Sequence, residues 1–175
     1  MTASDHALEL AILAARAASG KLAGDVVAID VSEHLVITDV FVLASAPNDR
    51  QVKAIVEGVE VALNAIGVKP IRREGERDGR WVLLDFGEIV VHVQHAEERS
   101  YYSLERLWRD CPTIPLPEDV ITSNAAAKER SNETYEPYDD SFNSAFTSDD
   151  ANGDESGNSV STGSPVSGVP GATGA

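Results

Sequence analysis

The sequence predicts an α/β domain on a mixed β-sheet of about five strands with about three helices, followed by a disordered C-terminal tail. Helical and strand-like hydrophobic patterns alternate through residues 1–111. Three prolines then fall within residues 112–117, and the chain turns to Ser, Gly, Asn and Asp. Such a composition buries too little apolar surface to offset the entropy of ordering the backbone. We therefore assign residues 1–111 to the domain and residues 112–175 to an acidic tail.

The first half of the domain predicts a helix, two strands and a second helix. Ser4 can cap a helix over residues 5–19, and Gly20 is placed to end it. Strands are predicted over residues 25–31 and 38–44. The second helix, over residues 49–66, carries one apolar stripe at helical spacing and is followed by Gly67. That stripe consists of Val52, Ile55, Val56, Val59, Leu63 and Ile66.

The second half predicts three strands and a third helix. A short strand over residues 69–74 precedes strands over 80–86 and 88–95, which form a hairpin across Gly87. Residues 97–109 predict a helix with acids in its first turn and arginines in its last, as the helix dipole favours. The expected order is α-β-β-α-β-β-β-α.

Charge and composition restrict the classes of partner. The net charge of −15 divides into −6 for residues 1–111, with 12 Lys and Arg against 18 Asp and Glu, and −9 for the tail. No dense basic patch is visible, which disfavours a large nucleic-acid footprint and is compatible with a basic protein partner. One cysteine, no long apolar run and no signal-like N-terminus indicate a cytoplasmic protein without a membrane helix.

The predicted hairpin has one unusual face. Because side chains alternate along a strand, one face is wholly apolar and is the natural core. The other face combines Trp81, Leu83 and Asp85 with His92 and Gln94. Two interpretations remain open: a helix of the same chain covers this face, or the face is open and belongs to a partner, since partner surfaces favour aromatic anchors among polar groups.

The sequence offers no convincing catalytic, metal or cofactor site. His92 and His95 are three residues apart on a strand and so point to opposite faces, which is wrong for a shared metal ion. No glycine-rich phosphate loop is present. The alternative is a magnesium-dependent enzyme of the nucleotidyltransferase kind that uses carboxylates at strand ends, namely Asp30, Asp39 and Asp85.

Residues 5–111 nevertheless resemble the Iojap-related ribosomal silencing factor family (RsfS). The resemblance rests on several segments in order and at family spacing. These are residues 38–45 (TDVFVLAS), 49–52 (DRQV), Glu74-Gly75, 81–87 (WVLLDFG), 91–93 (VHV), and Arg99 with Tyr102-x-Leu104-Glu105-x-Leu107-Trp108.

The resemblance implies a non-enzyme with a nucleotidyltransferase-like fold that lacks the active site. Family members bind the large ribosomal subunit through its fourteenth protein, a basic protein on the subunit-joining face. They thereby block subunit association and damp translation, chiefly under nutrient limitation. Members are often homodimers when free, with little direct nucleic-acid contact.

Pattern and resemblance together point to a docking surface on the mixed face of the hairpin. An acidic domain with apolar anchors suits a basic protein, because electrostatics speed the encounter and buried anchors hold the complex. The residues expected to bind the partner are Trp81, Leu83, Asp85, His92 and Tyr102, with Glu74 and Glu88 as acids at the rim.

Overall fold

The computed structural model describes residues 2–133. Six strands form one sheet in the order β3-β4-β5-β2-β1-β6. Its strands are β1 (Gly24–Asp30), β2 (Val40–Ala46), β3 (Arg72–Glu74), β4 (Trp81–Asp85), β5 (Ile89–His95) and β6 (Thr113–Ile114). Its helices are α1 (Asp5–Gly20), α2 (Asp49–Ala65), α3 (Ala96–Tyr102), α4 (Leu104–Leu107) and α5 (Glu118–Glu133). The mixed α/β class is thus confirmed.

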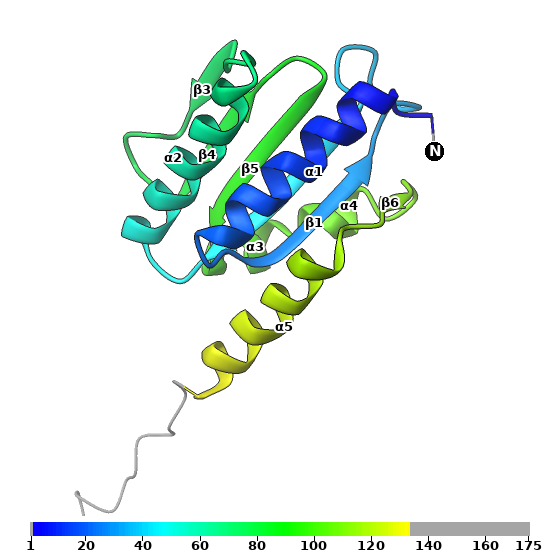
Figure 1. Ribbon diagram of the computed structural model, residues 1–175. Coiled ribbons are helices and arrows are strands. Elements are labelled where there is room, and N and C mark those ends of the chain that lie inside the picture. Colours follow the sequence, from blue (N-terminus) through cyan, green and yellow to red (C-terminus); the bar gives the residue numbers. More distant parts are fainter. Residues whose placement is uncertain (1, 134–175) are drawn as a thin grey trace, which may run out of the picture. The chain divides into compact units, whose positions relative to one another are not determined.

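The central pair of strands, β2 and β5, is parallel, and every other neighbouring pair is antiparallel. Helices α1 and α2 lie side by side on one face of the sheet, and α3 and α4 lie on the opposite side (Figure 1). The main core fills the layer under α1 and α2. It includes the apolar hairpin residues Val82, Leu84, Phe86, Ile89, Val91 and Val93, as the alternation predicted.

Local signals explain the two long helices. The Ser4 hydroxyl accepts a hydrogen bond from the Ala7 amide at 3.1 Å, and Asn48 caps α2 in the same way through the Gln51 amide. The predicted stripe of α2 is buried except for Ile66, which lies just beyond the helix end. Helix α1 ends with Gly20 as its last residue, one position later than predicted, and the left-handed residue beyond it is Leu22, with φ of 61°.

The turn between β3 and β4 requires a glycine. Gly75 has φ of +76°, and a Cβ built on it would lie 1.8 Å from the Trp81 carbonyl oxygen. No side chain fits so close to another backbone. Gly75 therefore allows β3 to turn tightly against the start of β4.

Two predictions about the C-terminal part of the domain were wrong. The single helix expected over 97–109 is broken at Ser103, which is left-handed with φ of 45° and ψ of 58°. The expectation that regular structure ends at Pro112 also fails, because β6 pairs with β1, and α5 packs against β1 and α1. The prolines end one element without excluding the next. The remaining tail, residues 134–175, lies outside the described residues.

Candidate functional site

The mixed face of the hairpin forms as predicted. In the antiparallel pairing of β4 and β5, Trp81 lies opposite Gln94 and Leu83 opposite His92. Directly opposed residues share one face of a sheet. Trp81, Leu83, Asp85, His92 and Gln94 therefore lie on the face turned away from α1 and α2.

The two strands of this face differ in burial, because His92 and Gln94 on β5 are buried whereas the side chains of β4 on this face are partly exposed. Over β1 and β2, a second apolar cluster of Ile29, Val31, Leu43 and Cys111 is covered by the chain's own Trp108 and Leu104. Over β4, Trp81, Leu83 and Asp85 are only half-buried, and the neighbouring Tyr102 is 52% exposed. The part with the tryptophan is accessible, as an interaction surface requires.

An unbroken row of aromatic rings crosses this face. Ring centroids lie 5.0 Å apart for Tyr101 and Tyr102, 4.9 Å for Tyr102 and Trp81, and 6.0 Å for Trp81 and His92. The row continues through Phe41 to Trp108 at spacings of 5.1 and 5.3 Å. We call these six residues, Tyr101, Tyr102, Trp81, His92, Phe41 and Trp108, the aromatic row. Its exposed end combines large apolar area with hydroxyl groups, which suits a protein contact.

His92 lies beneath this face and is almost completely buried. It is 6% exposed, which leaves little of its surface for the direct contact with a partner that the sequence predicts. Its Nδ1 accepts a hydrogen bond from the Trp81 indole Nε1 at 3.3 Å. Burial, and then the nearby positive charge of Arg99, lower the pKa of His92 to about 4. The imidazole is therefore neutral near pH 7 and holds the indole in place.

Two acids lie beside the exposed end of the face. Asp85 accepts a hydrogen bond from the Gly87 amide at 2.9 Å, and its other oxygen lies 3.7 Å from the Arg72 guanidinium. Glu74 lies opposite Leu83 in the sheet and pairs with Arg72 at 3.2 Å. Arg72 thus sits between the two carboxylates at the edge of the face.

Glu88 does not belong to this group. Its carboxylate pairs with His6 at 2.9 Å and accepts a hydrogen bond from the Ser4 hydroxyl at 3.2 Å. Both partners belong to the start of α1, which packs on the other side of the sheet. The structure therefore gives Glu88 a role in fixing α1 and separates it from Trp81 and its neighbours.

The strand-end carboxylates hold the N-terminal segment. Asp30 accepts hydrogen bonds from the Thr2 and Ala3 amides at 2.8 and 3.2 Å, and Asp39 accepts one from the Ser4 amide at 3.0 Å. Burial alone would raise the pKa of Asp30, but hydrogen bonds from Ser32, Ala3 and Thr2 outweigh it and lower the pKa. Within residues 2–133, no three His, Cys, Asp or Glu side chains are grouped to hold a metal ion.

The lone cysteine is not set up as a nucleophile. Cys111 is buried, and burial together with the charges of Asp110, Asp30 and Glu33 raises the pKa of its thiol. A reactive cysteine needs the opposite shift, since the thiolate is the nucleophile.

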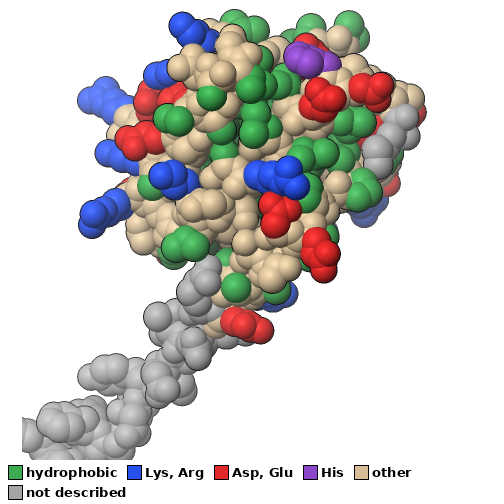
Figure 2. All heavy atoms as spheres, in the orientation of Figure 1, with side chains coloured by type: hydrophobic (Ala, Val, Ile, Leu, Met, Phe, Trp, Pro, Cys, Tyr) green, Lys and Arg blue, Asp and Glu red, His purple; other side chains and the backbone are tan. Residues whose placement is uncertain are grey.

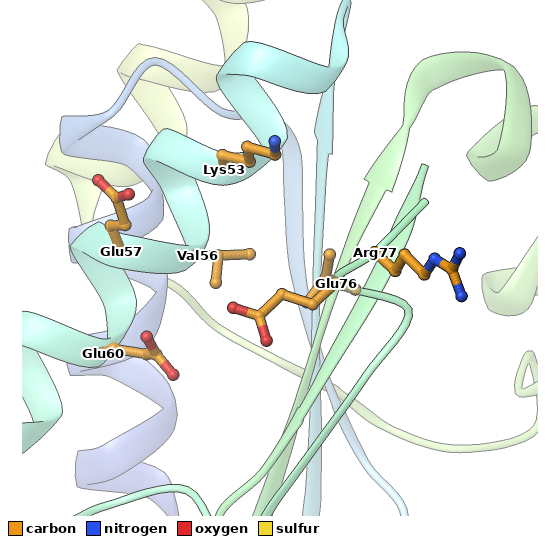
Figure 3. A pocket seen from close by; sticks show the side chains of 7 residues that line it. Lys53, Val56, Glu57, Glu60, Glu76 and Arg77 are labelled. Atoms are coloured by element: carbon orange, nitrogen blue, oxygen red, sulfur yellow. The ribbon is translucent and has the colours of Figure 1, made fainter. Parts of the chain in front are cut away.

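A polar hollow that the sequence did not indicate lies on the helix-covered side. Its volume is about 400 Å³, and it lies between α2 and the turn before β4. Glu60 and Glu76 reach toward one another across it (Figure 3). Partial burial raises the pKa of Glu60 against the opposing charge of Arg73, its ion-pair partner at 2.6 Å. The side chains labelled in Figure 3 are Lys53, Val56, Glu57, Glu60, Glu76 and Arg77.

Positive charge also gathers along the edge formed by α2 and β3 (Figure 2). The sequence showed no dense basic patch, and the fold brings these dispersed residues together. Much of the charge is compensated, since Arg73 pairs with Glu60, and Arg72 pairs with Glu74. This leaves the edge less cationic than its arginines alone would make it.

Fold and face together define a small α/β domain with a half-open aromatic sheet surface. None of the helices in residues 2–133 is long and apolar enough to cross a membrane. Residues 4–142 match the family model described as ribosomal silencing factor during starvation. The chain belongs to this ribosomal silencing factor family.

Named relatives agree with this assignment. The chain is 41% identical over 114 residues to ribosomal silencing factor RsfS of Halalkalibacterium halodurans, covering 65% of this chain and 97% of that protein. It is 39% identical over 104 residues to RsfS of Bacillus subtilis, covering 59% and 88%. A solved structure from Chromobacterium violaceum superposes with a TM-score of 0.56 at 36% identity, covering 58% of this chain and 84% of that one.

Proposed function

We propose that this protein binds the large ribosomal subunit through the sheet face that carries the aromatic row, which we call the aromatic face. Binding there prevents the small subunit from joining. The partner surface would be the basic fourteenth protein of the large subunit on its subunit-joining face. Repression of translation then needs only occupancy of that surface. In this proposal the protein acts in the cytoplasm, without cofactor or catalysis, and chiefly when nutrients are limiting.

The observation that carries the proposal is that the half-buried Trp81 and the exposed Tyr102 share a sheet face with Asp85, with Glu74 at its edge. Interface anchors are commonly aromatic residues in the centre, ringed by polar groups. Two carboxylates at the edge complement a basic partner and speed association. The family's name as ribosomal silencing factor supports the ribosome as the place of action.

Co-sedimentation with isolated large ribosomal subunits tests the proposal. Trp81→Ala combined with Asp85→Lys removes an anchor and reverses a charge, and should abolish co-sedimentation. Val61→Ala is a matched control, because Val61 is 70% exposed on α2, away from this face. Binding by the double variant as tight as that of the parent would refute the docking surface.

A second measurement addresses silencing itself. Excess protein should lower the fraction of joined ribosomes when small and large subunits are mixed and separated on a gradient. The Trp81→Ala, Asp85→Lys variant should leave that fraction unchanged. An equal effect of the variant would mean that subunit joining is blocked by another part of the chain.

A further inference from the structure

Arg99 ties together three segments of the chain behind the aromatic row. It lies on α3 and is 6% exposed. Its Nη2 donates to the backbone oxygen of Asp25 at 2.8 Å, and its Nε donates to Glu105 Oε1 at 2.6 Å. The start of β1, helix α3 and helix α4 therefore meet at one guanidinium.

The segments that Arg99 joins have unusual backbone conformations. Asp25 and Ser103 both have positive φ, 46° and 45°, a region that L-residues other than glycine seldom adopt. Ser103 separates α3 from α4 and donates its hydroxyl to the Ser100 carbonyl at 2.7 Å. The bend at Ser103 determines how α3 and α4 are directed across the sheet.

Few residues next to this bend are buried, although Leu104 packs on the cluster over β1 and β2. Arg99 is the buried residue of α3, and none of the residues of α4 is buried. A hollow of about 390 Å³, lined in part by Asp25, Arg99, Ser103 and Glu105, lies next to it. Arg80 also pairs with Glu97 and Glu98 and so holds α3, whereas the hydrogen bonds of Arg99 connect α3 to both β1 and α4.

The bend separates two parts of the aromatic row. Tyr101 and Tyr102 come from the end of α3, and Tyr102 packs on Trp81. Trp108 directly follows α4 and packs on Phe41. A change in the angle between α3 and α4 would separate at least one of these ring pairs.

We propose that Arg99 is the positioning residue of the aromatic face, because it fixes the bend at Ser103. The bend in turn places Tyr102 against Trp81 and Trp108 against Phe41. This inference rests on the function proposed above. Arginine suits the task because its rigid fork donates to two acceptors at once, which lysine cannot reproduce. The charge of Arg99 also helps to keep His92 neutral, so that His92 accepts the hydrogen bond of Trp81.

The test compares variants of the full chain in two measurements. The first is the position of the Trp81 and Trp108 indole N–H resonances in ¹H–¹⁵N spectra, assigned with Trp81→Phe. The second is affinity for isolated large ribosomal subunits. The variants are Arg99→Gln, which removes the charge, and Arg99→Lys, which keeps it. Arg106→Gln is the matched control, because Arg106 is exposed on α4 and lines the same hollow.

Both Arg99 variants should shift the two indole resonances and weaken subunit binding at least tenfold, whereas Arg106→Gln should do neither. If Arg99→Gln does not fold, Glu105→Ala replaces it, because this change removes the side-chain acceptor of the Arg99 Nε bond and keeps Arg99 in place. Unchanged indole resonances in the Arg99→Gln variant, or in Glu105→Ala used in its place, would overturn the inference. Parent-like behaviour of Arg99→Lys would also overturn it, since charge alone would then suffice.

The two measurements separate this inference from the function on which it rests. A parent protein that does not bind large subunits would refute the proposed function, while the indole resonances would still report whether Arg99 positions the rings. Binding by the parent with no loss in any Arg99 variant would refute the role of Arg99 and leave the proposed function standing.

Discussion

Asn124 pairs with the backbone of Val26 through both ends of its side-chain amide. Its Oδ1 accepts from the Val26 N–H at 3.0 Å, and its Nδ2 donates to the Val26 carbonyl at 2.9 Å. A neighbouring strand would make the same two bonds, but β6 reaches only Ala28 and Ile29 of β1. One side chain of α5 thus completes the edge of the sheet, where unpaired backbone groups could otherwise pair with strands of other molecules.

Asn124→Ala should lower the free energy of unfolding by about 1–2 kcal/mol, because it leaves part-buried backbone groups of Val26 without partners. Urea unfolding monitored by circular dichroism measures this. Thr122→Ala is the control, since its exposed hydroxyl bonds only within α5. Equal stability of parent and Asn124→Ala would show that the edge does not depend on α5.

Truncation tests where the domain ends. Ile114 and Val120 are buried in the main core, and burying each such side chain contributes about 2 kcal/mol. A chain ending at residue 111 should therefore unfold at a lower urea concentration than the full chain. A chain ending at residue 133 should match the full chain, since the composition of the remaining residues predicts no contribution to the core. Equal urea midpoints for all three chains would instead place the end of the folded domain at residue 111.

His92 should make stability fall as the solution is acidified. Its pKa is lowered from 6.5 to about 4 in the fold, so below pH 6.5 the unfolded chain takes up a proton that the folded chain does not. Stability is complete above the unfolded pKa and is lost progressively as pH falls toward the folded pKa. Between pH 7 and pH 5 we expect a loss of about 2 kcal/mol from this residue.

Urea unfolding of the parent and of His92→Gln at both pH values checks this, because glutamine does not titrate and still offers an acceptor to Trp81. The parent should lose more stability than the variant on acidification. Identical losses would mean that the imidazole is not held neutral in the fold.

Periodicity predicted the elements whose buried faces are regular. The α2 stripe and the alternation of β4 follow directly from burial on one side, whereas β5 is buried on both faces. The same reasoning put Trp81, Leu83 and Asp85 on one face. It also placed His92 there but could not predict its burial, which depends on how α3 crosses the sheet. Spacing along one strand carries no information about that crossing.

The missed features depend on contacts between distant segments. Ser103 is not a residue type that indicates a left-handed break, and its conformation is held by hydrogen bonds of α3 and by Arg99. Helix α5 has a weak sequence signal, because among its residues 118–129, whose burial is described, only Val120 and Ala127 are buried. The carbonyl of Pro117 accepts from Val120 and Ile121 at its start. Pro117 followed by two acids was the available signal for a helix N-terminus.

The final prediction concerns self-association. The sequence offered two surfaces for a dimer, the alanine-rich first helix and the mixed hairpin face. The apolar side of the first helix is not available for a dimer, because Ala7, Ala11 and Ala15 are fully buried in the core. On the opposite side of the sheet, Tyr101 of the aromatic row is 82% exposed. We therefore expect any dimer to form through the aromatic face.

Light scattering at two protein concentrations tests this expectation. The parent should show a mass that rises with concentration, and Trp81→Ala should remain monomeric at both. If dimer and ribosome use the same face, the rate of capture by large subunits should rise less than in proportion to the total protein concentration, because each dimer must first dissociate. A dimer that Trp81→Ala leaves intact would instead assign self-association and ribosome binding to separate surfaces, and capture would then be independent of the dimer.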